Sequence, residues 1–239
     1  MKISFYESWK TVDTNMLKGK TAIVIDVLRA TSTIVTALNN GARFIVPVKE
    51  VEEAWQYYHN NGDKDSIILG GERKAVQIQG FHFGNSPLSY TKERVKDKIV
   101  VLTTTNGTKA IDSAKDAEDL YIGTFLNSAA LIQKLLLSEK DLAIICSGTN
   151  GMFSLDDIIC GGKIIYELSK KYKIDCNDIG MSAKILYENY KDNLPALLKN
   201  CYHYNLLLNK GFKDDLQHCF SRDIYDIIPY FNDGIIRIL

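Results

Sequence analysis

Three times in this chain an apolar segment runs into a short polar loop, and an apolar segment with helical spacing follows the loop. The three loops are residues 27–33, 103–108 and 146–151. This order predicts a strand, a connecting loop and a helix in each case. A helix N-terminus presents unpaired N–H groups and a partial positive charge. The sequence therefore predicts three loops that bind phosphate or a similar oxyanion.

Apolar runs alternate with longer segments of 3.6-residue period along the chain, a pattern typical of α/β proteins. We therefore expect mixed, mostly parallel sheets flanked by helices. The expected strands are Thr21–Ile25, Phe44–Pro47, Ser66–Leu69, Lys98–Leu102, Leu142–Ile145 and a strand around Leu120–Tyr121. The expected helices are Ser32–Asn39, Glu50–Asn60, Thr108–Ser113, Ser128–Leu137, Leu155–Tyr172, Asp178–Asn189, Pro195–Asn200 and Asp214–Phe220.

The first two loop-containing units resemble each other, which suggests two similar α/β halves at about residues 20–95 and 96–172. Each unit has a strand, a threonine-rich loop, a helix and a second strand, with Ala42 and Ala117 at corresponding places. No Pro-, Gly- or Ser-rich linker separates the halves, so we expect the 239 residues to form one α/β catalytic unit. From about Ile174 onward we expect packed helices rather than chemistry.

Composition and charge exclude several classes of protein. Lys+Arg and Asp+Glu are equal at 29 each, so no net charge attracts the chain to nucleic acid or to a membrane surface. No apolar run reaches the roughly 18 residues of a transmembrane helix, and the first residues lack a signal peptide's apolar core. Five cysteines without a CxxC pair favour a reducing, cytoplasmic compartment. We expect a small anionic substrate, no nucleic-acid or membrane partner, and allow for a homodimer.

The first loop has the composition of a metal-and-phosphate site. Asp26 ends a predicted strand, and ligands of open α/β sheets bind beyond the carboxyl ends of the strands. Arg29, Thr31 and Ser32 follow within six residues. The carboxylate suits Mg²⁺, the guanidinium suits a phosphate, and the hydroxyl groups suit the remaining oxygens. The alternative is a helix N-cap cluster, but the density of polar groups favours function.

Two further loops carry candidate ligands. Glu72 and Arg73 follow an apolar strand and two glycines, which makes them a second candidate metal ligand and a second candidate anion ligand. A glycine turn with a solvated Glu–Arg pair is the alternative, and for this motif alone we favour it. In loop 80–87, Asn85 and Ser86 are placed to bind an oxyanion, although Asn-Ser-Pro is also ordinary turn chemistry.

The loop at residues 103–108 is the strongest single candidate for an anion site. Its candidate ligands are Thr104, Thr105, Asn106, Gly107 and Thr108. Hydroxyl groups, a backbone nest around a glycine and a helix start together suit a phosphate. Neither the Walker pattern nor GxGxxG occurs in the chain, so we expect no nucleotide-binding P-loop and no Rossmann dinucleotide site.

The third loop contributes Ser147, and Asp156 and Asp157 follow it at a predicted helix start. Adjacent acids at this place suit a metal ion or polarise a water molecule. A capping box formed by Ser154 and Asp157 is an equally good interpretation. The four histidines and five cysteines show no zinc-ligand spacing, so we expect a core or surface role for them, including His203.

Five motifs together resemble the 2-phosphosulfolactate phosphatase family in order and spacing. They are residues 25–33, 70–73, 80–87, 104–108 and 153–157, and the segments 211–216 and 226–229 are similar too. The resemblance covers nearly the whole chain. It implies a Mg²⁺-dependent phosphatase of coenzyme M biosynthesis, with an α/β fold peculiar to the family, that converts (2R)-2-phospho-3-sulfolactate to 3-sulfolactate and phosphate. One position departs from the family's pattern, because His82 stands where the loop usually has an aspartate.

The resulting hypothesis gives each candidate residue a role. The catalytic residues are Asp26, Arg29 and Asp157, the metal ligands are Asp26, Glu72 and Asp156, and the substrate-binding residues are Thr31, Ser32, Arg73, Asn85, Thr104, Thr105, Asn106, Gly107, Thr108 and Ser147. Mg²⁺ bridges a phosphate oxygen, and Arg29 and loop amides stabilise the charge of the transition state. Attack by water and attack by an aspartate both stay open. The alternatives are a phosphatase for another small phosphorylated carboxylic acid and a non-catalytic anion-binding protein.

Overall fold

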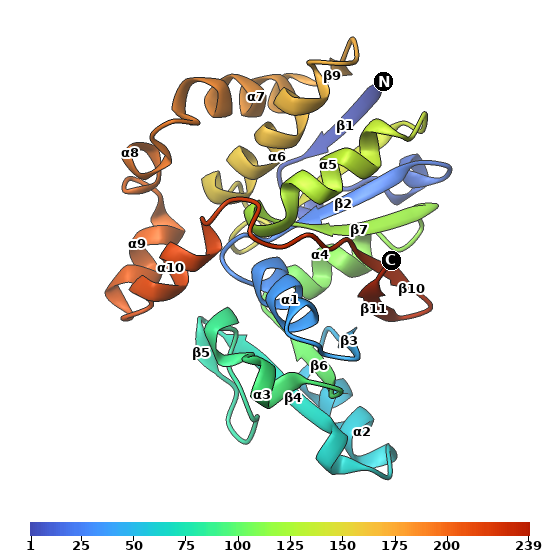
Figure 1. The fold of residues 1–239 in the computed structure, drawn as a ribbon, viewed down its shortest axis with the longest axis vertical. Coiled ribbons are helices and arrows are strands. Elements are labelled where there is room, and N and C mark those ends of the chain that lie inside the picture. The colour runs from blue at the N-terminus through green and yellow to red at the C-terminus, as the bar shows by residue number, and fades with distance from the viewer.

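The computed structural model describes residues 1–239 and confirms the predicted α/β class, a mixed and mostly parallel sheet flanked by helices (Figure 1). The strands are β1 Lys2–Tyr6, β2 Thr21–Ile25, β3 Phe44–Pro47, β4 Ile67–Arg73, β5 Val76–Gln77, β6 Ile99–Thr103, β7 Asp119–Gly123, β8 Leu142–Cys146, β9 Asp175–Cys176, β10 Pro229–Asn232 and β11 Ile235–Ile238. The helices are α1 Ala30–Asn39, α2 Val51–Asn60, α3 Lys92–Val95, α4 Gly107–Ser113, α5 Ser128–Leu136, α6 Leu155–Leu168, α7 Asp178–Tyr190, α8 Leu194–Leu198, α9 Tyr202–Asn209 and α10 Lys213–Cys219. None of these helices has the length and apolarity needed to cross a membrane.

The eleven-stranded sheet consists of two parallel blocks joined by an antiparallel hairpin. Strands β4, β6 and β3 form one block, and β7, β2, β8, β1 and β9 form the other. Between them, β10 pairs antiparallel with β7, and β11 pairs antiparallel with β3. The C-terminal end of the chain therefore completes the sheet near its middle (Figure 1).

The two predicted halves exchange strands within this sheet. The first unit, β2–α1–β3, places β2 between β7 and β8 of the second half, while β6 of the second half lies between β3 and β4. Helices α1 and α4 pack against each other. The halves are thus interleaved in one sheet, and their similarity stays a prediction.

The side chains of β2 alternate between two hydrophobic cores. Ile23 and Ile25 pack in a core with residues of α5 and α6, whereas Ala22 and Val24 pack in a second core with residues of α1 and α4. This second core also contains Val100 of the other parallel block, so α1 and α4 fill the space between the blocks. A smaller third core lies under α2. The sequence of β2 is apolar throughout because both of its faces are covered.

The predicted element boundaries agree with the structure to within a few residues, with informative exceptions. Strands β2 and β3 have the predicted bounds. Strand β4 continues to Arg73 rather than ending at Leu69, because Gly70 and Gly71 still pair in parallel with β6. The sequence analysis missed β1, the hairpin β10–β11 and α9. The missed helix α9 is the one that matters for the site described below.

The approach of α1 to α4 requires Gly107. A Cβ atom on this residue would lie 2.4 Å from the Cβ of Ala30 and 2.7 Å from Oδ2 of Asp26. Neither neighbour is the flexible end of a long side chain. The start of α4 therefore reaches the start of α1 only because this position has no side chain.

We predict that Gly107→Ala lowers the free energy of unfolding by about 1–3 kcal/mol, because the new methyl group overpacks a buried contact. Urea denaturation followed by circular dichroism measures the change. Gly62→Ala is the matched control, since a Cβ there has no heavy atom within 4 Å. Equal stability of the two variants would contradict the proposed role of Gly107.

Candidate active site

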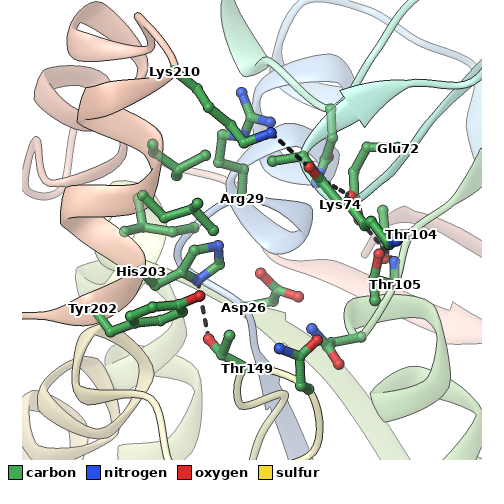
Figure 2. A pocket seen from close by; sticks show the side chains of 17 residues that line it. Asp26, Arg29, Glu72, Lys74, Thr104, Thr105, Thr149, Tyr202, His203 and Lys210 are labelled. Carbon is green, nitrogen blue, oxygen red and sulfur yellow. Dashed lines mark hydrogen bonds between the residues drawn. The ribbon is translucent and has the colours of Figure 1, made fainter.

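A cavity of about 370 Å³ opens where the carboxyl ends of strands from both parallel blocks meet. Asp26 follows β2, Glu72 lies in β4, Thr104 follows β6 and Thr149 follows β8, and all four line the cavity. Helix α9 forms the opposite wall and faces these strand ends (Figure 2). The cavity thus combines the predicted ligand-binding edge of the sheet with a helix from the C-terminal part of the chain.

The structure brings seven of the predicted site residues to this cavity. They are Asp26, Arg29, Glu72, Asn85, Thr104, Thr105 and Asn106. The other eight predicted residues do not line it. They are Thr31, Ser32, Arg73, Gly107, Thr108, Ser147, Asp156 and Asp157. Their contacts show what they do instead.

The polar groups at the start of α1 bond to one another. Asp26 Oδ1 accepts the N–H of Ala30 at 3.1 Å, and the Asp26 carbonyl accepts the N–H of Thr31 at 3.0 Å. The hydroxyl of Thr31 donates to the same carbonyl, and that of Ser32 donates to the carbonyl of Val27. The protein's own acid therefore occupies part of the predicted anion site at this helix start.

The second loop is capped in a similar way. The N–H of Thr108 donates to the hydroxyl of Thr104 at 3.2 Å, and the N–H of Thr104 is 3.4 Å from the hydroxyl of Thr108. Glu72 accepts the N–H of Thr105 at 2.8 Å with one oxygen and that of Ala75 at 2.7 Å with the other. Glu72 therefore holds this loop and the β4–β5 turn in place.

Arg73 points away from the cavity and binds the neighbouring backbone. Its guanidinium donates to the carbonyl groups of Glu72 and Lys49 and to the hydroxyl of Thr103 at 2.9–3.0 Å. The predicted solvated Glu–Arg pair does not form. Arg73 thus stabilises the ends of β4 and β6 rather than contacting the cavity.

Asp157 joins two loops from beneath the cavity. Its carboxylate accepts the N–H of Val27 at 2.8 Å, the N–H of Gly148 at 3.0 Å and the hydroxyl of Ser147 at 3.1 Å. The capping box with Ser154 is not formed, because Ser154 makes no capping hydrogen bond to the helix. Burial is the main cause that raises the pKa of Asp157, and the charges of Asp156 and Asp26 raise it further.

A chain of hydrogen bonds leads from buried Asp156 to the cavity wall. Ser154 Oγ donates to Asp156 Oδ1 at 2.5 Å and lies 2.9 Å from Thr149 Oγ1. Thr149 Oγ1 in turn lies 3.2 Å from Nδ1 of His203. Because each hydroxyl has one proton, Thr149 donates to Ser154 and His203 donates to Thr149. His203 thus lines the cavity (Figure 2), a place that the sequence analysis did not predict for it.

Asp26 is the buried acid at the centre of the site. Burial raises its pKa from the ordinary 3.8 to about 6, and the hydrogen bond from Ala30 and the charge of His203 oppose this shift. The carboxyl group therefore changes charge just below neutral pH. Perturbed acids in clefts are candidates for function.

Arg29 connects the first loop to the C-terminal helices. Its Nη1 lies 2.6 Å from Oδ2 of Asp215 in α10, and both side chains are almost fully buried. The second oxygen of Asp215 accepts the hydroxyl of Ser86 at 2.6 Å. The guanidinium also lies 4.0 Å from the ring centre of Phe212. This pairing holds the wall that contains α9 against the strand ends.

Two polar atoms in the cavity lining lack hydrogen-bond partners. Only three buried side-chain polar atoms in the molecule are unpaired, and two of them are Asn85 Oδ1 and Thr105 Oγ1. Buried polar atoms are normally paired, so an unpaired one indicates a place for a ligand or a water molecule. His82, in contrast, does not line the cavity, and its Nδ1 accepts the N–H of Leu69 at 2.9 Å.

The sequence analysis missed the residues that α9 contributes. His203, Leu206, Leu207 and Lys210 line the cavity together with Tyr202. The first four have the spacing i, i+3, i+4 and i+7, which places them on one helical face. The spacing was a usable signal for a shared face, but it carries no information about what that face contacts. Lys74 of the β4–β5 turn was missed as well.

The chain is similar to phosphatases over almost its full length. A family model described as 2-phosphosulpholactate phosphatase matches residues 6–234. A probable 2-phosphosulfolactate phosphatase of Clostridium novyi (strain NT) is 47% identical over 232 residues, which are 97% of each chain. A protein of the same name from Clostridium tetani (strain Massachusetts / E88) is 44% identical over 237 residues, which are 99% of this chain and 100% of that protein. One from Caldanaerobacter subterraneus subsp. tengcongensis is 40% identical over 237 residues, which are 99% of this chain and 98% of that protein.

We predict that Asp215→Ala lowers the free energy of unfolding by about 3–5 kcal/mol, because it leaves the buried Arg29 guanidinium without its carboxylate. Urea denaturation at neutral pH measures the loss. Asp214→Ala is the matched control, because the neighbouring Asp214 is exposed and forms no ion pair. Its effect should stay within about 0.5 kcal/mol. A similar small effect for Asp215→Ala would contradict the tie between α10 and the first loop.

We predict that Asp26→Asn stabilises the protein above neutral pH. The pKa of Asp26 is about 6 in the folded state and about 3.9 in the unfolded chain. The folded state therefore holds the Asp26 proton more tightly than the unfolded chain does, and this binding adds to the free energy of unfolding at low pH. Wild type loses that contribution as pH rises through 6. Asparagine keeps an oxygen for the Ala30 N–H without charging. The gain should reach about 3 kcal/mol above pH ~7 and fade below pH ~4.

Urea titrations of wild type and Asp26→Asn in EDTA at several pH values test this dependence. The difference in unfolding free energy should grow between pH ~4 and ~7 and then level off. A difference that stays constant over this range would show that Asp26 does not titrate there.

Proposed function

We propose, because this chain belongs to the 2-phosphosulpholactate phosphatase family, that it hydrolyses (2R)-2-phospho-3-sulfolactate to 3-sulfolactate and phosphate. The observation that carries this proposal is the cavity that Asp26 and Arg29 line together with Asn85 and Thr105, two residues that each have an unpaired buried polar atom. An oxygen-rich ligand would satisfy the hydroxyl of Thr105. A phosphate ester bound here would lie between an acid and a guanidinium.

The proposal includes Mg²⁺, and the donor atoms of the cavity fit this ion. No group of three or more His, Cys, Asp or Glu side chains is arranged to hold a metal. Mg²⁺ at phosphoryl-transfer sites is commonly held by one or two carboxylates, waters and the substrate's own phosphate. Asp26 would supply a carboxylate, and Asn85, another residue of the lining, has a side-chain oxygen without a hydrogen-bond partner. When bound, the ion would neutralise the negative charge of the phosphate oxygens.

We assign a role to each remaining polar side chain of the cavity from the donor or acceptor atoms that its contacts within the protein leave free. Arg29 gives one nitrogen to Asp215 and has further N–H groups for a phosphate oxygen. The hydroxyl of Thr105 donates to a second oxygen. Glu72 holds the loop, because both of its oxygens already accept backbone N–H groups. Asp156 and Asp157 support the site from beneath rather than touching the substrate.

The surroundings of the enzyme follow from the same proposal. All five cysteines are free, which is consistent with the proposed cytoplasmic location. The product 3-sulfolactate would serve coenzyme M synthesis, as the family resemblance implies. A homodimer and the absence of a nucleic-acid partner stay predictions.

We predict that purified protein releases phosphate from 2-phospho-3-sulfolactate with Mg²⁺, and that EDTA abolishes the release. Asp26→Asn should lower kcat by roughly 100-fold or more, a typical loss for one group that stabilises transition-state charge. Asp116→Asn is the matched control, because Asp116 is exposed and does not line the cavity. The malachite-green assay measures phosphate.

Four outcomes separate the alternatives. Full turnover by Asp26→Asn would remove Asp26 from the chemistry, and turnover in EDTA would exclude the metal. Faster release from phospholactate or phosphoglycerate would indicate another phosphorylated carboxylic acid as substrate. Binding of 3-sulfolactate without any release of phosphate would indicate a non-catalytic anion-binding protein.

A further inference from the structure

The charges of the cavity lining leave an anionic substrate dependent on two lysines. Asp26 and Glu72 are the acids of the lining, and Arg29 is already paired with Asp215. The proposed function assigns Mg²⁺ and Arg29 to the phosphate, so without Lys74 and Lys210 no formally charged cation of the lining would be left for the carboxylate and the sulfonate. These two lysines, which we call the lysine rim, are the only other formally charged residues of the lining.

The lysine rim brings together two parts of the chain that are distant in sequence. Lys74 lies between β4 and β5, and Lys210 follows the last residue of α9. The Lys210 ammonium donates to the backbone carbonyl of Lys74 at 3.0 Å, across the mouth of the cavity (Figure 2). Neither lysine has a carboxylate within 4.0 Å, whereas Lys49, Lys140 and Lys163 each form an ion pair. The positive charge of the rim is therefore available to a ligand.

The backbone that carries Lys74 is fixed in an unusual conformation. Lys74 and Ala75 have φ values of 53° and 61°, in the left-handed region that costs a residue with a Cβ about 1 kcal/mol. Glu72 holds this turn by accepting the N–H of Ala75 at 2.7 Å. The same Glu72 holds the Thr105 loop, so the rim and the proposed phosphate site are built on one carboxylate.

We propose that Lys74 and Lys210 bind the sulfonate group of the substrate and thereby favour it over phosphorylated acids that lack this group. This inference rests on the proposed function. A sulfonate is ionised at all physiological pH values and carries three equivalent oxygens. Ammonium groups on flexible stems reach such a group as point charges, each with three rotatable N–H donors. With the phosphate between Asp26 and Arg29, the lysine rim receives the sulfonate.

The two contributions of Lys74 can be separated experimentally. Its carbonyl accepts the Lys210 hydrogen bond, while its side chain supplies charge to the cavity. Lys74→Gln removes the charge and keeps the carbonyl, so the bridge across the mouth survives. Lys210→Gln removes the second charge, and Lys210→Arg restores a cation and a donor. Lys199→Gln is the control, because Lys199 is exposed and does not line the cavity.

The test compares kcat/KM for 2-phospho-3-sulfolactate and for 2-phospholactate, in which a hydrogen replaces the sulfonate. We expect Lys74→Gln and Lys210→Gln each to lower the ratio of the two values by roughly tenfold, the effect of losing one charged hydrogen bond. The loss should lie in KM for the sulfonated substrate. Lys210→Arg should recover most of the preference, and Lys199→Gln should keep all of it.

An unchanged ratio of the two kcat/KM values would overturn the proposal. If both values fall by the same factor, the rim only holds the cavity together. If wild type hydrolyses neither compound, the proposed function fails, and calorimetry then tests the rim alone. In that case wild type should bind 3-sulfolactate more tightly than lactate, and the two glutamine variants should lose this preference. Equal binding of both acids by wild type would overturn the sulfonate assignment.

Discussion

The buried ion pair between Arg29 and Asp215 is the contact on which the cavity depends. It joins the loop after the first central strand to a helix near the end of the chain, 186 residues later. Isolated charges are costly to bury, and this pair is tolerated because each partner has further contacts, Ser86 for the carboxylate and Phe212 for the guanidinium. With α10 fixed, α9 before it presents the face with His203, Leu206 and Leu207 to the strand ends. One ion pair thus positions both sides of the cavity, the strand ends and helix α9.

The helix starts that the sequence marked as anion sites are partly satisfied by the protein itself. Asp26 caps the start of α1, and Thr104 and Thr108 cap the start of α4 in a reciprocal way. Composition cannot distinguish a loop that binds phosphate from a loop that caps itself, because both need the same hydroxyl and carboxyl groups. What remains for a ligand is set by side chains such as Thr105, whose hydroxyl has no partner. Binding capacity here depends on unpaired side-chain atoms more than on helix dipoles.

The predictable part of the fold is the part with strong local signals. Strands β2 and β3 were predicted residue for residue because they are short apolar runs, each preceded by a basic residue. The joining of the two parallel blocks was out of reach, since it depends on the β10–β11 hairpin. Strand β10 pairs with β7 and β11 pairs with β3, each more than 100 residues earlier in the chain. For the site, strand ends predicted Asp26, Glu72 and Thr104 correctly as cavity residues. Helix α9 was missed because helical spacing defines a face but not its neighbour.

Three buried carboxylates lie close together beneath and within the cavity. Asp156 and Asp26 both contribute to the raised pKa of Asp157, and Asp156 contributes to that of Asp26. Such a cluster costs stability at neutral pH, because burial and like charge both oppose ionisation. Asp157 alone would be explained by its structural hydrogen bonds to Val27 and Gly148. Asp26 makes fewer such bonds and lines the cavity, so among the three acids its raised pKa marks the candidate for function.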